Sequence, residues 1–567
     1  MNSQMNLFGK KIDKNSNVSN SKSNKFKVTN HQAESYKGIY RMHKYWSKKP
    51  YNVIRKFIET YSEENDIVLD PFSGSGVSIS EAIFAGRKAF GIDINPSAIF
   101  ITKQVIRPVS TKEVEIEFKK IESKLKDKIN SFYTVKRNNK EFIGSHFIWE
   151  NNELTEIWYK KGRNKKIIPP KEDDLKLYNS FLYENIPYFY PKNHFFNNSR
   201  INTKQEMQVY KLFTPRNLTA LSLILNQIEK IPDPSIKDFF KFCFTAATGQ
   251  ASKMVFVIKR RGKTKDAQTP IRKDVGSWVI GYWVPKENME INAWNCFENR
   301  YKTSLKAKKE YEKLDIYIKE TEDFKELKNF SNLLLVNEPS QKALEKVPSN
   351  SIDYIITDPP HGNRQPYLEL SIMWNSWLNN ENINYEDEII ISDAKNRNKN
   401  PNNYYLLLNK VLREIERVLK PNKYFSLMFN SLDDETWADL VYNLNKLQLE
   451  IEKIETLEYS ARSVVQDSRK SGLKTDFIIT FKKNPNKKFK EIQFIKVREN
   501  QKAFINNIND CLSHSIDGLE TYKIFNLLIR YHLENNEFFE LSEIFNLLKK
   551  EFKYEKGKWI QSDKNES

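Results

Sequence analysis

The chain has 567 residues, with 92 Lys and Arg against 73 Asp and Glu, which gives a formal net charge of +19. This length exceeds one ordinary hydrophobic core and predicts two or three domains. No apolar run approaches the roughly 20 residues of a membrane-spanning helix, which argues against a membrane protein and predicts a cytoplasmic one. The positive charge favours a polyanionic partner, although a genome biased towards Lys and Asn would produce the same excess.

The cysteines and the N-terminal segment add two expectations. Cys243, Cys296 and Cys511 are too far apart in sequence to suggest a metal-binding clip. We therefore predict a reducing compartment and no metal site. Residues 1–30 are rich in Asn, Ser and Lys without a hydrophobic stretch, and they predict a disordered lead rather than a secretory signal.

The first structured region follows Pro50, after which a helix is predicted. A short apolar strand at 66–70, a Gly-rich turn, an amphipathic run at 77–89 and a second strand at 89–95 come next. Strand, turn, helix and strand within about thirty residues indicate a βαβ unit. The sequence therefore predicts an α/β fold with a doubly wound, parallel, Rossmann-like sheet.

The alternation of strands and helices stops at about residue 105 and resumes at about residue 330. This pattern predicts a sheet domain interrupted by a large insertion. Strands are predicted in "NLLLVN", "IDYIIT", "KYFSLMFN" and "TDFIITFKKN", with a helix in "YYLLLNKVLREIERVL". The insertion shows a helical pattern at 214–231 and a strand-like pattern at 277–285, "SWVIGYWVP". We assign the sheet domain to 31–104 and 330–484, the insertion to 105–329, and a small helical appendage to 485–567.

The Gly-rich turn "VLDPFSGSG", residues 68–76, lies where ligands of doubly wound folds bind. Gly74 and Gly76 would let backbone amides approach a ligand closely. Asp93, at the end of the second strand, is placed to accept hydrogen bonds from both hydroxyls of a ribose. The turn lacks the phosphate-loop and dinucleotide patterns, so the ligand need not carry phosphates. A plain Gly-rich turn with a solvated Asp93 is the structural alternative.

A second motif, Asp358-Pro359-Pro360-His361, directly follows the strand "IDYIIT". In a parallel sheet this strand end faces the same crevice as the Gly-rich turn. The two prolines restrict the backbone and orient the Asp358 carboxylate and the nearby carbonyls, a set of acceptors suited to gripping an amino group. Taken alone, the motif is weak, because Asp-Pro-Pro also ends ordinary strands.

Together, "DPFSGSG", "GIDINPSA" and "TDPPHG" resemble the S-adenosylmethionine-dependent DNA amino-methyltransferases, which methylate the exocyclic nitrogen of adenine or cytosine. The upstream "HKYWSKKPYNVI" is similar to a segment that holds the methionine end of the cofactor in a subgroup of these enzymes. The resemblance implies S-adenosylmethionine as cofactor and duplex DNA as partner. The residues it implies for cofactor binding are Lys48, Lys49, Asp70, Pro71, Phe72, Ser73, Gly74, Gly76, Asp93, Asn95 and Asn337.

For catalysis the resemblance implies Asp358, Pro359, Pro360 and His361. Asp358 and the Pro359 carbonyl would accept hydrogen bonds from the target amine, whose nitrogen then attacks the methyl group in line. The family usually has Tyr or Phe at the fourth position, stacked on a flipped base. His361 departs from that pattern: its ring can stack over a smaller area and can also form hydrogen bonds.

In this family the long insertion corresponds to a target-recognition region. Residues 259–273 hold seven basic residues and one acid, followed by Trp278, Tyr282 and Trp283, a composition that suits phosphate contact and base stacking. An exposed Lys-rich loop followed by a core strand explains the same residues. A restriction or defence-system partner is compatible with the family, and the sequence does not indicate the oligomeric state.

Several functions stay open at this point. Asp at the first motif position favours N6-adenine over N4-cytosine within the resemblance. "TDPPHG" also resembles a motif of tRNA guanine-N2 methyltransferases, but only about 65 residues precede the Gly-rich turn, too few for the usual RNA-binding module. An inactive nucleic-acid-binding protein is less favoured, because the Gly-rich turn, Asp93 and Asp358 are all present.

Overall fold

The computed structural model describes residues 30–161, 164–260, 272–279, 281–363, 365–430, 434–458, 476–489, 491–513, 515, 517–555 and 557–561. The predicted lead and most of the basic stretch 259–273 lie outside these residues. Contacts divide the chain into a larger unit, residues 30–493, and a smaller C-terminal unit that begins at residue 494. The predicted domain boundaries at 104, 330 and 484 stay predictions.

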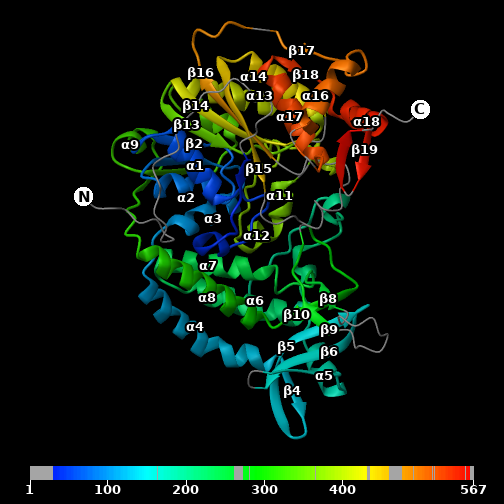
Figure 1. Cartoon of the computed structure of the whole chain (residues 1–567). Helices are drawn as coiled ribbons and strands as arrows, with labels where there is room; N and C mark the ends of the chain where they lie inside the picture. Colours follow the sequence, from blue (N-terminus) through cyan, green and yellow to red (C-terminus); the bar gives the residue numbers. More distant parts are fainter. Residues whose placement is uncertain are drawn as a thin grey trace. The chain divides into compact units, whose positions relative to one another are not determined.

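A mixed sheet forms the centre of the larger unit (Figure 1). Among the described residues its order is β1 (Asn30–Gln32), β15 (Leu449–Glu458), β16 (Asp476–Lys483), β14 (Leu419–Phe429), β13 (Ile352–Thr357), β2 (Ile67–Asp70), β3 (Lys88–Ile92), β12 (Leu333–Val336) and β11 (Glu320–Thr321). Only β16 runs antiparallel to its neighbours, β14 and β15. The expected doubly wound α/β fold is confirmed, and β1 and β11 extend its sheet at either edge.

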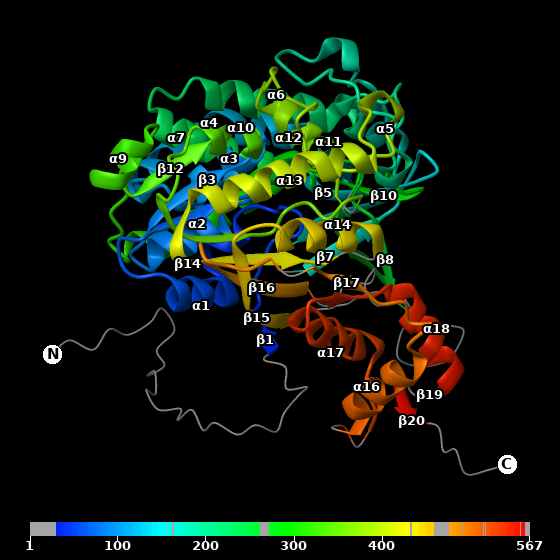
Figure 2. The ribbon, with the colours of Figure 1, turned by 90° about the horizontal axis from the view of Figure 1, so that it is seen from above.

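Helices cover both faces of this sheet, as right-handed crossover connections require (Figure 2). The chain moves from β2 to β3 and on to β12 in one direction, then returns to β13 and β14 in the other. One helix group, with its contacts on β2, β3, β12, β13 and β14, is α1 (Tyr51–Tyr61), α2 (Val77–Phe84) and α3 (Pro96–Ile106). The other is α10 (Ser340–Glu345), α13 (Pro401–Val418) and α14 (Asp434–Asn445). The strand order reverses between β2 and β13, where such sheets bind ligands.

The predicted elements of the sheet domain match the described strands and helices closely. The run "VLD" is buried on both sides in β2, and "IDYIIT" forms the fully buried β13. Both strands read as continuous apolar runs because parallel strands covered by helices on both faces have no solvated side. The aromatic-rich segment after the second motif forms two short helices, α11 (Tyr367–Leu370) and α12 (Ile372–Trp377).

The region between β3 and β11 contains helices and a second sheet. Its longer helices are α4 (Thr111–Ser131), α6 (Pro215–Glu229), α7 (Pro234–Thr248) and α8 (Ala293–Glu312), with the short α5 (Glu172–Asn179). Its strands are β4 (Thr134–Arg137), β5 (Lys140–Glu150), β6 (Glu153–Lys161), β7 (Asn164–Ile168), β10 (Glu287–Ile291), and the pair β8 (Val257–Arg260) and β9 (Arg272–Val275). The buried Arg216–Glu290 ion pair, with Nη2 2.8 Å from Oε2, joins α6 to β10. The predicted helix at 214–231 is confirmed.

The predicted strand at 277–285 is wrong for the residues that the structure describes there. Trp278 and Tyr282 are buried, but in a loop. The Tyr282 hydroxyl donates a hydrogen bond of 2.6 Å to the Leu370 carbonyl, and its backbone N–H donates to the Ile201 carbonyl at 2.8 Å. Gly281 has a φ of +92°. Tyr282 therefore packs this loop against α11, and Trp278 packs it against Trp374 of α12, rather than the two forming one face of a strand.

The smaller unit combines helices with short strands. It contains α16 (Gln501–Ser513), α17 (Thr521–Glu534), β18 (Glu537–Phe538), α18 (Leu541–Glu551), β19 (Phe552–Glu555) and β20 (Lys558–Gln561). The predicted helices at its centre and end are present as α17 and α18, while the hairpin of β19 and β20 was not predicted. The remaining short elements of the described chain are β17 (Gln493–Phe494), α9 (Phe324–Asn329) and the 3₁₀ turns η1 (Gly38–Arg41), η2 (Tyr183–Asn185), η3 (Ser199–Ile201), η4 (Val209–Leu212) and η5 (Lys395–Arg397).

Across the described residues, none of the helices has both the length and the apolar composition needed to cross a bilayer.

Candidate active site

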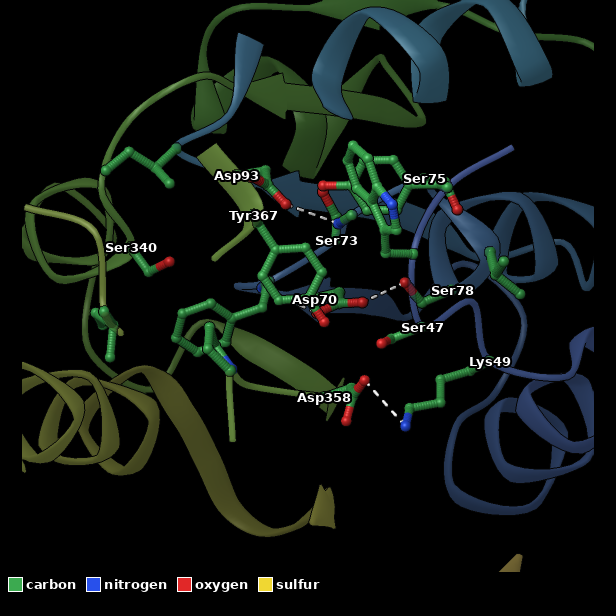
Figure 3. Close-up of a pocket in the computed structure, with 18 of the residues that line it drawn as sticks. Ser47, Lys49, Asp70, Ser73, Ser75, Ser78, Asp93, Ser340, Asp358 and Tyr367 are labelled. Carbon is green, nitrogen blue, oxygen red and sulfur yellow. Dashed lines mark hydrogen bonds and ion pairs between the residues drawn. The ribbon is translucent and has the colours of Figure 1, made fainter. Parts of the chain in front are cut away.

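A pocket lies at the carboxyl ends of β2, β3 and β13 (Figure 3). Its lining residues come from 45–49, 70–78, 93–94, 339–341, 358–367 and 387–389, together with Ile54 and Met428. The two sequence motifs and the segment before α1, which are far apart in the chain, therefore meet at one pocket.

The pocket contains most, but not all, of the predicted site residues. Those that line it are Lys48, Lys49, Asp70, Phe72, Ser73, Gly74, Asp93, Asp358 and Pro360. Six others, although described by the structure, are not part of this lining: Pro71, Gly76, Asn95, Asn337, Pro359 and His361.

The two glycines of the turn have different structural roles. Gly74 has a φ of +51°, and a Cβ there would meet the Tyr45 ring at 3.3 Å. Gly76, with a φ of +74°, precedes α2, and a Cβ there would meet Thr102 Cγ2 at 2.4 Å. Gly76 thus allows the turn to pack against α3, and its expected contact with a ligand stays a prediction. Only the Gly74 position faces a pocket residue.

Gly76→Ala should destabilise the larger unit, because it adds a clash with Thr102 to the strain of a positive φ. We expect the free energy of unfolding to fall by about 2–4 kcal/mol, measured by chemical denaturation. Gly86→Ala is the matched control: Gly86 has a φ of +75°, but a Cβ there would lie 3.6 Å from its nearest neighbour, Glu64. Its loss should stay near 1 kcal/mol. Equal losses for the two variants would contradict the packing role of Gly76.

Asp70 connects the Gly-rich turn to the second motif. It accepts hydrogen bonds from the Phe72 N–H at 3.0 Å, from the Thr357 hydroxyl at 2.6 Å and from the Ser78 hydroxyl. Burial raises the pKa of its carboxyl group to about 6, against the lowering effect of these donors. Because Thr357 immediately precedes Asp358, the contact fixes the end of β13 relative to the turn after β2.

Asp93 occupies the position expected for a ribose-binding acid. Its two oxygens accept hydrogen bonds from the Gly74 and Asn95 N–H groups, each at 2.8 Å. A carboxylate has about four acceptor positions, so capacity remains for a ligand. Burial raises the pKa of Asp93 to about 7, and the negative charges of Asp70 and Glu388 add to this effect. The ionisation of Asp93 therefore changes near neutral pH.

The two predicted asparagines lie beside the pocket rather than in its wall. The buried Asn95 caps α3 by accepting from the Ser97 N–H at 3.1 Å, and it donates to Ser371 Oγ at 2.7 Å. Asn337 is exposed and donates to the Asp93 carbonyl at 2.8 Å. Asn337 and Asn95 thus both support the loop that carries Asp93.

Lys49 lies between two buried carboxylates. Its ammonium nitrogen is 3.0 Å from Asp358 Oδ2 and 2.5 Å from Asp476 Oδ2, and the three side chains are 8–15% exposed. Asp476 is the first residue of β16. Since β16 runs antiparallel, its beginning lies at the same edge as the carboxyl ends of the parallel strands. Lys48 instead donates to the Tyr40 and His43 carbonyls at 3.0 and 2.9 Å, and burial lowers its pKa to about 8.

Lys49→Met should destabilise the protein by about 3–5 kcal/mol, because it removes the ammonium group that lies 3.0 Å from Asp358 Oδ2 and 2.5 Å from Asp476 Oδ2. Chemical denaturation measures the loss in the free energy of unfolding. Lys48→Met is the neighbouring control: it removes hydrogen bonds to two backbone carbonyls rather than contacts with carboxylates, and it should cost about 1–3 kcal/mol. Equal losses for the two variants would argue against the charge cluster.

Asp358 keeps one acceptor available. Its Oδ2 contacts Lys49, but Oδ1 is buried without a hydrogen-bond donor among the described residues. His361 Nε2 is 3.0 Å from this Oδ1, yet the angles do not form a hydrogen bond, and the same nitrogen lies 3.4 Å from the Met428 carbonyl oxygen. The His361 ring packs edge-on against Phe429, with 4.9 Å between centroids, and its side chain is 9% exposed. Asp358 Oδ1 therefore has capacity for a donor from outside the protein.

Sequence reasoning missed several pocket residues. Tyr45 and Tyr367 line it with rings 6.2 Å apart, and Glu388 also lines it, with its carboxylate 2.7 Å from buried Arg397. Asp476 was missed as the second partner of Lys49. The acidic start of the strand at 476–483 was a usable signal, but only once that strand is known to be antiparallel.

The comparisons with known proteins agree with the motifs. Residues 5–104 match the model of a family described as DNA methylase. The Type II methyltransferase M.MjaII of Methanocaldococcus jannaschii is 23% identical over 363 residues, which cover 60% of this chain. The resemblance to the DNA amino-methyltransferases is confirmed. The aligned part spans 62% of that relative's length.

Solved structures of a DNA modification methylase from Thermus thermophilus were also found, one of them complexed with S-adenosyl-L-methionine. They are 14–15% identical and cover 30% of this chain and 60–63% of theirs, with TM-scores of 0.15–0.16.

The pocket fits the cofactor of the DNA amino-methyltransferases, S-adenosylmethionine. This molecule carries a carboxylate, an ammonium, a sulfonium and a ribose, and the lining offers both lysine ammonium groups and carboxylates. Ser73 Oγ, like Asp358 Oδ1, is a buried atom of a lining residue without a hydrogen-bond partner among the described residues. Asp93, with Tyr45 and Phe72 nearby, suits a nucleoside. When bound, the cofactor would supply an electrophilic methyl group.

Proposed function

We propose that this protein transfers a methyl group from S-adenosylmethionine to the exocyclic amino group of a flipped base in duplex DNA, with adenine N6 as the favoured target. The observation that carries the proposal is the buried, unsatisfied Oδ1 of Asp358 in the wall of the same pocket as Asp93. An acceptor that receives no hydrogen bond from the described residues, in the same pocket as Asp93, suits the recognition of a substrate amine.

In the proposed transfer, a nitrogen–carbon bond would form as the sulfonium–methyl bond of the cofactor breaks, and the nitrogen would lose one proton to Asp358 or to solvent. Asp358 Oδ1 accepts a hydrogen bond from the target N–H, which draws the nitrogen lone pair out of conjugation and towards the methyl group. Lys49 holds Oδ2, so the carboxylate cannot rotate freely. Asp70 keeps the end of β13 in place through Thr357. Neither a metal ion nor a covalent intermediate is required.

In this proposal His361 positions the side chain of Asp358 and does not stack on the target base. Its ring is mostly buried against Phe429, and its Nε2 approaches Oδ1. The neighbouring Tyr367 does line the pocket, 6.2 Å from Tyr45. Tyr367 is therefore a better candidate for a ring that faces a bound planar group.

Expression in a host free of DNA methylation, followed by modification-sensitive long-read sequencing, tests the function. We expect N6-methyladenine at one recognition sequence, and none with Asp358→Asn. N4-methylcytosine in its place would establish the alternative base. Unmodified DNA together with methylated tRNA guanine would move the assignment to the RNA methyltransferases. A restriction or defence-system partner remains part of the proposal only if the modified sequence protects DNA from cleavage.

A further inference from the structure

The C-terminal unit has a helix order that is familiar from helix-turn-helix proteins. α16 is followed by a one-residue bridge at Leu519, then by α17, the two-residue strand β18, α18 and the hairpin of β19 and β20. Leu519 and Trp559 exchange two backbone hydrogen bonds, of 3.0 and 2.7 Å. The bridge pairs the hairpin with the segment between the first two helices. This connectivity is that of a winged helix, in which the helix before the hairpin is the one presented to DNA.

Buried side chains hold the hairpin and the helices of this unit together. Trp559, on β20, is 5% exposed and donates from Nε1 to Thr521 Oγ1 at 2.8 Å, which ties the hairpin to the beginning of α17. On α18, Ile544 and Leu548 are fully buried. The buried and exposed sides of α18 are thereby fixed, since residues four apart share one side of a helix.

The exposed face of α18 is polar and basic. Ser542, Asn546, Lys549 and Lys550 are exposed at a spacing that places them along one side of the helix. Glu543 does not interrupt this face, because it is 13% exposed and held by Arg498, with Oε1 2.7 Å from Nε. Glu551, the last residue of α18, is 19% exposed, and its Oε1 lies 3.3 Å from the Lys550 ammonium group.

The hairpin next to α18 continues the basic surface. Lys553 and Tyr554 are exposed on β19, and Lys558 begins β20. Exposed acids lie at the edges: Glu540 precedes α18, and Glu555 pairs with Lys553 at 2.7 Å. Lys549 and Lys550 thus lie next to each other near the end of α18, with Glu551 beside Lys550 and with Glu540 and Glu555 further away along the chain.

We propose that the face of α18 binds the major groove of duplex DNA, as a second DNA-contacting module besides the methyl-transfer pocket. An 11-residue helix is about 16 Å long, and the major groove is about 12 Å wide, so the helix can enter it. Asn546 and Ser542 are suited to base edges, and Lys549 and Lys550 to phosphates. Double-stranded RNA fits less well, because its major groove is too narrow and deep for side chains to read.

The proposal can be tested on the whole chain without cofactor, so methyl transfer does not enter the measurement. Binding of a fluorescein-labelled duplex of about 30 base pairs is followed by anisotropy at several salt concentrations. Lys549→Ala/Lys550→Ala should weaken binding about tenfold, and the slope of log affinity against log salt should become shallower by about 1.8 if both lysines contact phosphates. Lys496→Ala/Lys502→Ala removes the same charge from exposed positions in the same unit, and it should leave the slope unchanged.

A cross-link gives a second readout that does not depend on charge. Asn546→Cys, labelled with an azidophenacyl group, should cross-link to the duplex on illumination, whereas Lys502→Cys with the same label should not. The three native cysteines are buried, which limits background labelling. An unchanged salt slope with no cross-link at position 546 would overturn the proposal, as would an effect confined to double-stranded RNA. Loss of methyl transfer with an intact cross-link would count against the proposed enzyme function alone.

Discussion

Asp358→Ala is expected to abolish methyl transfer while S-adenosylmethionine still binds within about twofold of the original affinity. The substitution removes Oδ1, the buried acceptor that has no hydrogen-bond donor among the described residues. Loss of a group that stabilises the reacting centre typically costs about 10²–10³-fold in rate, and here the same group also orients the nucleophile. The rate should therefore fall by at least roughly a thousandfold.

The measurement combines single-turnover methylation with calorimetric cofactor binding on the same preparations. Asp358→Asn keeps the shape of the side chain, so its activity isolates the carboxylate's contribution from packing. Asp476→Asn is the matched control: it removes the other partner of Lys49, 2.5 Å away, from a residue that does not line the pocket. Its rate should fall less than tenfold. Activity retained in Asp358→Ala would refute the catalytic assignment.

A feature of this site could be predicted from the sequence only where the residues that form it are recognisable from their local sequence. Asp70, Gly74, Asp93 and Asp358 each end or closely follow a recognisable strand of a parallel sheet, and such ends converge on one edge. Local sequence therefore placed them at one pocket. The pairing of Lys49 with Asp476 spans 427 positions, and no local pattern distinguishes that lysine from its neighbour Lys48.

The differences between the expectations and the structure have the same physical origin. The strand-like pattern around Trp278 predicted a strand, but burial came from hydrogen bonds and packing within a loop. The ligand contact expected of Gly76 stays a prediction, and the structure adds a packing role, because its missing Cβ makes room for Thr102. In both cases the residue type was correctly recognised as buried or special. The partner that explains it lies elsewhere in the chain and becomes visible only in the fold.

The same limit applies to the C-terminal unit. Periodicity predicted α17 and α18 as helices, but the pattern of Ser542, Asn546 and Lys549 looks like any solvated helix face. The hairpin beside α18 is what indicates a winged-helix arrangement, and the Leu519–Trp559 bridge holds this hairpin in place. A bridge of one residue leaves no periodic signal in the sequence.

Asp93→Asn is expected to weaken S-adenosylmethionine binding by about ten- to a hundredfold, because two hydrogen bonds to a charged acceptor are replaced by bonds to a neutral amide. The native protein should also show a pH dependence. Burial raises the pKa of Asp93 to about 7, so the carboxylate becomes protonated, and a poorer acceptor, as the pH falls from 8 to 6. Affinity should fall about tenfold over this interval.

Isothermal titration calorimetry at pH 6, 7 and 8 separates this effect from the titration of the cofactor itself. The Asn variant cannot ionise at this position, so it should lose most of the pH dependence while its affinity at pH 8 is reduced. A weaker dependence near pH 6 should persist in it, because the pKa of the neighbouring Asp70 is raised to about 6. If native and variant proteins show the same slope between pH 8 and pH 6, the titrating group is not Asp93, and the assignment of the ribose-binding acid loses its electrostatic support.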